Sequence, residues 1–199
     1  MKLPRKVFAC LAAICYSLSG CYWRSTHVIP DRISAIPPKI RSIAIFPFAD
    51  ARTNPYHLRH FPAPSSELQE KLIARISGSP GLQIVEREQI NKLLEEQKLQ
   101  ITGAVDDKSA VQMGKIMGVQ AVLMGSINQY GRHWFTMPYV TTLITFRLVD
   151  VETGNILVSR EVVANNVNMF YPYRNLRDSL KQAADAIARV INEAASKKF

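Results

Sequence analysis

The segment 175–195 constrains the fold most, because its apolar residues follow one side of a long helix. They recur at helical spacing and are Leu176, Leu180, Ala183, Ala184, Ile187, Ile191 and Ala194. Basic residues keep the rest of this helix polar. A helix with one apolar stripe needs a partner surface to cover that stripe. The sequence therefore predicts a layered domain in which this helix packs on other elements.

Segments of strand and helix character alternate along the rest of the chain. Strand-like runs rich in apolar and β-branched residues occupy 41–48, 82–85, 121–129, 140–151 and 155–164. Helical spacing is found at 66–77, 86–98 and 109–117. The first of these helices starts with a Ser66–Gln69 capping-box pattern, and the last is followed by Gly118 as a left-handed cap. The order β-α-β-α-α-β-β-β-α predicts an α/β fold with helices packed on a mixed β-sheet.

Residues 1–21 have the pattern of a bacterial secretion signal that ends in a lipidation site. A basic start precedes an apolar run over 7–18 that is too short for a permanent membrane span. The tetrapeptide LSGC at 18–21 resembles the bacterial lipobox, which implies cleavage before Cys21 and acyl chains, such as palmitate, on that residue. The alternatives are an uncleaved anchor and a conventional signal peptide with a coincidental cysteine.

This interpretation divides the chain into a signal peptide at 1–20, a lipidated tether at 21–39 and an α/β domain at 40–199. The tether is polar and marked by prolines, so we expect it to be extended. Tyr22, in place of Asp, at the second mature position resembles lipoproteins that are sorted to the outer membrane. We therefore expect the domain to face the periplasm from that membrane.

Charge and cysteine content fit this location. Loss of the signal lowers the formal charge from +9 to +6, because three basic residues leave with it. Such a surface suits phosphate head groups or other acidic partners. Since Cys10 and Cys15 also leave, Cys21 is the remaining cysteine and no disulfide can form within the monomer. The chain has no arginine-rich groove, zinc-ligand spacing or RNA-binding signature, and we do not expect it to bind nucleic acid.

The sequence carries no recognisable catalytic motif. His57 and His60 stand in the sequence HLRH, but a metal site on one element more often adds a carboxylate or cysteine at ligand spacing. Adjacent glutamates such as Glu95 and Glu96 point in different directions on a helix and do not converge on one cleft. A phosphate-binding glycine loop and a nucleophile elbow are also missing. We expect neither an enzyme nor a cofactor or metal.

Three blocks in order resemble the CsgG superfamily. They are IVEREQINKLLEEQKLQITG at 84–103, GKIMGVQAVLMGSI at 114–127 and LVDVETGNILVSREV at 148–162. The resemblance covers most of 41–195 and implies a CsgG-like fold, related to anticodon-binding domains. It also implies a periplasmic or outer-membrane lipoprotein, often assembled in rings, that takes part in the export of amyloid subunits or polysaccharide.

The resemblance also draws attention to two loops. CsgG inserts membrane-spanning hairpins where this chain has only 131–139 and 165–173, and a spanning hairpin needs roughly 20 residues or more. This shortness resembles the polysaccharide-export PelC-like members of the family. Both loops carry large amphipathic side chains, and basic groups lie beside them. We predict membrane contact for Trp134, Phe135, Met169, Phe170, Tyr171 and Tyr173, and lipid head-group contact for Arg132, His133 and Arg174.

Two other interpretations of these side chains stay open, namely a subunit interface and packing in the core. The function predicted overall is a homo-oligomeric collar in an export or envelope-assembly system. Its partners would be the outer membrane, further copies of itself, and export proteins or an exported polymer. The alternatives are a periplasmic activator of a peptidoglycan synthase, as LpoB is, and a monomeric stress- or flagellum-associated lipoprotein. The sequence does not identify the cargo or the subunit number.

Overall fold

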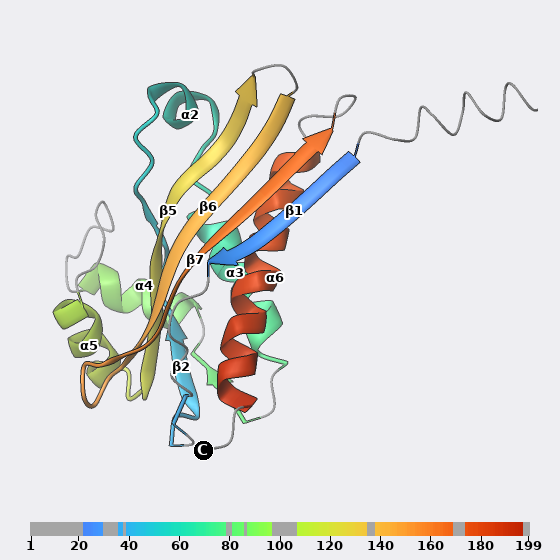
Figure 1. The fold of residues 1–199 in the computed structure, drawn as a ribbon. Helices are drawn as coiled ribbons and strands as arrows, with labels where there is room; N and C mark the ends of the chain where they lie inside the picture. The colour runs from blue at the N-terminus through green and yellow to red at the C-terminus, as the bar shows by residue number, and fades with distance from the viewer. Residues whose placement is uncertain are drawn as a thin grey trace, which may run out of the picture.

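A seven-stranded mixed sheet forms the centre of the domain (Figure 1). The computed structural model describes residues 22–29, 36–37, 39–78, 81–85, 87–96, 107–134, 138–168 and 174–196. The strands are β1 (Tyr22–Ile29), β2 (Ser42–Ile45), β3 (Ala49–Asp50), β4 (Gln83–Ile84), β5 (Ala121–Trp134), β6 (Pro138–Asp150) and β7 (Ile156–Asn168). The helices are α2 (Pro55–His60), α3 (Ser65–Ile76), α4 (Arg87–Glu96), α5 (Asp107–Ile116) and α6 (Arg174–Ser196). The predicted α/β class and mixed sheet are confirmed.

The strands lie in the order β1-β7-β6-β5-β2-β4, and β3 also pairs with β5. Strands β5, β6 and β7 form an antiparallel meander, with β1 antiparallel on its outer side. In contrast, β2 runs parallel to both β4 and β5. At the turn between β6 and β7, the Asp150 carboxylate accepts from the amides of Glu152 and Thr153. Gly154 there has φ of +74°, a left-handed conformation that favours glycine.

Helices cover both faces of the sheet and give two cores. Helices α3 and α6 lie on one face, where the predicted stripe of α6 is buried and Leu176 at its start is partly buried. Helices α4 and α5 lie on the other face, where Ile90 and Met113 pack against Phe46 and Met124. Because side chains alternate along a strand, β5 and β6 supply apolar residues to both cores. In Figure 1 the meander extends past α4 and α5 to its upper end.

Polar pairs fix the position of α6 along the sheet. The hydroxyls of Thr142 and Ser179 are 2.7 Å apart in the buried interface. The Gln182 amide donates to the Asn166 side-chain oxygen, which is fully buried, at 3.0 Å. Buried polar groups that are paired this way disfavour a shift of the helix, because a shift leaves them without partners. The helix therefore has one favoured position on β6 and β7.

Three local predictions were wrong. Residues 22–29 do not belong to an extended tether but form edge strand β1, consistent with the high strand propensity of the sequence YWRSTHVI. Most of the expected loop 131–139, and the start of 165–173, are paired strand. The capping box is absent because α3 starts at Ser65, and the Gln69 side chain donates into the core to the Ile45 carbonyl at 2.7 Å.

Among the described residues, no helix has both the length and the apolar character needed to cross a bilayer.

Gly125 tests the close packing of the meander. A Cβ at this position would collide with the Thr145 carbonyl oxygen and lie 2.6 Å from the Phe48 ring. We expect Gly125→Ala to lower the free energy of unfolding by about 3 kcal/mol, because the backbone oxygen cannot move without loosening the β5–β6 pairing. Urea unfolding followed by circular dichroism measures this. Gly78→Ala, where a Cβ meets nothing within 4 Å, is the control, and an equal loss there would contradict the explanation.

Candidate functional site

Four antiparallel strands terminate together at the upper end of the sheet in Figure 1. The paired residues there are Tyr22 with Asn168, Val167 with Tyr139, and Trp134 with Pro138. We call this end of the sheet the hairpin end. Cys21, the predicted lipidation site, immediately precedes the first residue of β1 in the sequence. The register of the strands thus brings the residue after Cys21 to the same end as the β5–β6 connection.

Helix α2 lies at the hairpin end beside β5, and a row of rings connects it to the sheet. The ring of His57 is edge-on to that of His133, with centroids 4.9 Å apart, and His133 stacks on Tyr139 at 4.9 Å. The Nε2–H of His57 donates to the Arg132 carbonyl at 3.0 Å. Gly131 lies under the His57 ring, since a Cβ there would be 2.7 Å from it. The helix is therefore seated on β5 through a histidine.

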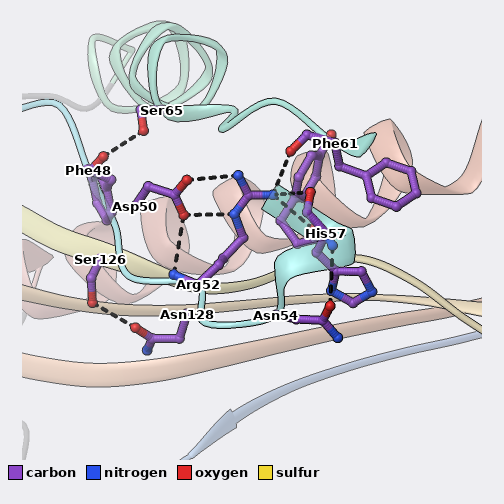
Figure 2. Close-up of polar contacts among 10 residues, drawn as sticks. Phe48, Asp50, Arg52, Asn54, His57, Phe61, Ser65, Ser126 and Asn128 are labelled. Atoms are coloured by element: carbon purple, nitrogen blue, oxygen red, sulfur yellow. Dashed lines mark hydrogen bonds and ion pairs between the residues drawn. The ribbon is translucent and has the colours of Figure 1, made fainter. Parts of the chain in front are cut away.

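A buried guanidinium holds the segment that contains α2 (Figure 2). Nε and Nη2 of Arg52 donate to the two carboxylate oxygens of Asp50 at 2.7 and 2.8 Å. Nη1 donates to the carbonyls of Phe61 at 2.7 Å, and of His57 and Tyr130 at 3.3 Å each. The guanidinium lowers the pKa of Asp50 below its usual 3.8. One side chain thus joins β3, the last turn of α2 and β5.

Burial changes the titration of two rings near this cluster. Desolvation, assisted by His57, lowers the pKa of His133 below its usual 6.5, so the ring is neutral at neutral pH. Its Nε2 is buried without a hydrogen-bond partner. Burial, with a smaller contribution from Glu67, raises the pKa of Tyr130 to about 12. Both groups favour the neutral form in the folded protein.

The predicted contact residues are only partly described. Cys21, Phe135, Met169, Phe170, Tyr171 and Tyr173 lie outside the described residues. Trp134 ends β5 and Arg174 begins α6, and their side chains are not described. Arg132 is half-buried, and His133 is packed between the rings of His57 and Tyr139. Membrane and head-group contact stay predictions for all of these residues.

Sequence reasoning missed α2 and Arg52. The signal for α2 was Asn54-Pro55, because asparagine is a preferred N-cap and proline is favoured at the first helical position. In the structure, the Asn54 side chain accepts from the amides of Tyr56 and His57 at 3.0 and 3.3 Å. The sequence around Arg52 did not indicate that this side chain is buried, since its partners include the carbonyl of Tyr130, which is distant in sequence. Within the described part of the chain, no cluster of three metal-ligating side chains occurs.

Comparisons with known proteins agree on the fold. The family model of the curli production assembly/transport component CsgG matches residues 31–138. A PelC dodecamer from Paraburkholderia phytofirmans is 11% identical with a TM-score of 0.52, and the match covers 88% of this chain and 100% of that one. The hypothetical protein CT253 from Chlamydia trachomatis is 13% identical with a TM-score of 0.52 and coverages of 79% and 99%.

The LpoB C-terminal domain from Salmonella enterica is 15% identical, with a TM-score of 0.47 and coverages of 67% and 85%. No curated protein sequence matches this chain. At these low identities the structural likeness concerns the fold alone. The resemblance to the CsgG superfamily is confirmed by the family match, which includes the blocks at 84–103 and 114–127, and by the PelC fold.

Arg52 offers a direct test of the clamp on α2. Arg52→Met removes the side-chain donor from the partly exposed Asp50 carboxylate and from three carbonyls, and a buried acceptor left without a donor costs about 1 to 3 kcal/mol. We expect faster amide hydrogen exchange over 55–61 and a lower free energy of unfolding. The control is Arg59→Met on exposed α2 surface. Unchanged exchange over 55–61 in Arg52→Met would contradict the clamp.

His133 predicts a pH dependence of stability. Its pKa is lower in the folded than in the unfolded protein, so the unfolded state binds the proton first and stability falls as pH drops through 6.5. Asp50 and Asp150, whose pKa values are lowered from 3.8, lose their contribution only at more acidic pH. We expect His133→Phe to reduce the difference in unfolding free energy between pH 7.5 and about pH 5. His27→Phe, on the exposed part of β1, is the control, and an unchanged difference in His133→Phe would refute the assignment.

Proposed function

This chain belongs to the CsgG family of curli production assembly/transport components, and on that premise we propose that it is a lipid-anchored periplasmic collar of the outer membrane. Acylated copies would assemble side by side in an export or envelope-assembly system. The role would be structural, without catalysis. The PelC relative is a dodecamer, which supports a homo-oligomer.

The observation that carries this proposal is the position of β1. Its eight residues start at Tyr22 and pair along β7, so no tether separates the domain from an acylated Cys21. The acyl chains would then hold the hairpin end at the bilayer surface. Trp134 and Pro138 pair at that same end, so the connection between them is too short to cross a bilayer. This supports contact of the predicted aromatic residues with the membrane interface instead of insertion through it.

The same observation weighs against an activator of peptidoglycan synthesis. Such a role at the outer membrane requires reach through the cell wall, and the reach of a flexible linker grows with its free length. Here the residues that were expected to act as a tether include a strand of the sheet itself. A domain fixed beside its anchor suits assembly in the plane of the membrane better than contact with a distant enzyme.

Mass photometry of the detergent-solubilised acylated protein tests the collar. We expect one discrete oligomer that persists on dilution, because ring closure gives each copy two interfaces. A matched sample of the Cys21→Ser protein, which lacks the acyl chains, shows whether the oligomer needs the anchor. A monomer at every concentration in both samples would refute the collar and favour the activator.

A further inference from the structure

Helix α2 turns a polar ring inward and exposes an apolar side chain on each of its two flanks. His57 is its buried residue, with 4% of its surface exposed, whereas Tyr56 is 54% and Leu58 is 45% exposed. A surface helix of a soluble domain normally has the opposite arrangement, because its apolar stripe faces the core. The two outward residues account for much of the apolar surface that so short a helix can offer. An apolar environment outside the domain would reverse the cost of exposing them.

The orientation of α2 is fixed, so rotation cannot hide these side chains. Nε2 of His57 donates a hydrogen bond to the Arg132 carbonyl. The His57 ring lies against Gly131, and a side chain at position 131 would collide with it. Arg52 binds the carbonyls of His57 and Phe61 and so holds the last turn. Tyr56 stacks outside the helix on His60, with centroids 4.2 Å apart. Tyr56 and Leu58 are therefore exposed on a helix whose orientation is fixed.

The position of α2 indicates what covers it. The ring of His57 contacts that of His133, which stacks on Tyr139. Tyr139 pairs with Val167 across β6 and β7, and Val167 pairs with Trp23 on β1. Trp23 is two residues after Cys21 in the sequence. Helix α2 thus lies at the hairpin end, where β1 begins. By contrast, exposed Ile116 and Ile156 lie near the start of β5 and the start of β7, at the opposite end of the sheet.

The charge of α2 agrees with a lipid surface. The helix contains Arg59 and His60, both exposed, and has no acidic residue. Exposed apolar and basic side chains on one short element are typical of segments that lie in the head-group region of a bilayer. Tyrosine also favours this depth, because its ring is apolar and its hydroxyl stays hydrated.

We propose that α2 is a second membrane-contact element, which inserts Tyr56 and Leu58 into the interfacial zone of a phospholipid bilayer. Arg59 lies at the level of the lipid phosphates. The inference rests on the proposed anchoring at Cys21 and adds an element that the predicted membrane-contact residues do not include. Contact at α2, on the β5 side, and at β1, on the far side of the sheet, sets the tilt of the domain on the membrane.

A fluorescent label at one cysteine tests the contact. The mature chain has only Cys21, whose sulfur is blocked when acylated, so Leu58→Cys gives a unique site for bimane. The matched control is Ile116→Cys, because Ile116 is 59% exposed at the other end of the sheet. Both acylated proteins are reconstituted into phosphatidylcholine–phosphatidylglycerol vesicles. Quenching by nitroxide-labelled phospholipid reports the bilayer, and quenching by iodide reports water.

We expect lipid quenching at position 58 to exceed that at position 116 several-fold, with the reverse order for iodide. A label at 58 that iodide reaches as readily as at 116 would overturn the proposal. A label at 58 protected from both quenchers would also overturn it, since a protein surface would then cover α2. Equal lipid quenching at both positions would contradict contact at one end. Protein that fails to float with the vesicles refutes the anchor itself, and the inference with it.

Discussion

The antiparallel register of β1, β7, β6 and β5 is the constraint on which the functional geometry depends. Each strand is long, and their shared register makes their ends coincide. A shift of one residue would turn every side chain to the opposite face. Such a shift would expose the fully buried Ile144 and break the Thr142–Ser179 contact with α6. The core therefore fixes the position of the hairpin end, although that end contributes little to the core itself.

The segment around α2 depends on a different interaction, the buried Arg52 guanidinium. A charge removed from water is tolerated only when its donors find partners, and here the Asp50 carboxylate and three carbonyls supply them. Much of this segment is exposed, so hydrophobic burial alone cannot hold it. The directional hydrogen bonds of one planar group replace the missing core. This explains how exposed apolar side chains are carried on an ordered element.

Periodicity predicted the parts of the fold whose burial repeats regularly. The apolar stripe of α6 and the strands β6 and β7 were identified because the burial of their residues follows the helical or the strand period. Gly118, with φ of +67°, ended its helix as expected. By contrast, β1 was missed because YWRSTHVI mixes polar and apolar residues, so its strand propensity shows only once it pairs with β7. The Arg52 and His57 contacts were missed because their partners lie on β5, far along the chain.

A lipid anchor joined directly to a strand of the sheet would change the energetics of assembly as well as the position of the domain. Association in solution loses translational and rotational freedom that interface contacts must offset. Copies held at one surface by acyl chains, with β1 starting directly after the anchor, would already share a plane and an axis. Their effective concentration rises, and fewer orientations are lost when neighbours dock. A flexible tether would raise the effective concentration without fixing the orientation. Under the proposed anchoring, the eight paired residues of β1 therefore favour ring assembly at the membrane surface.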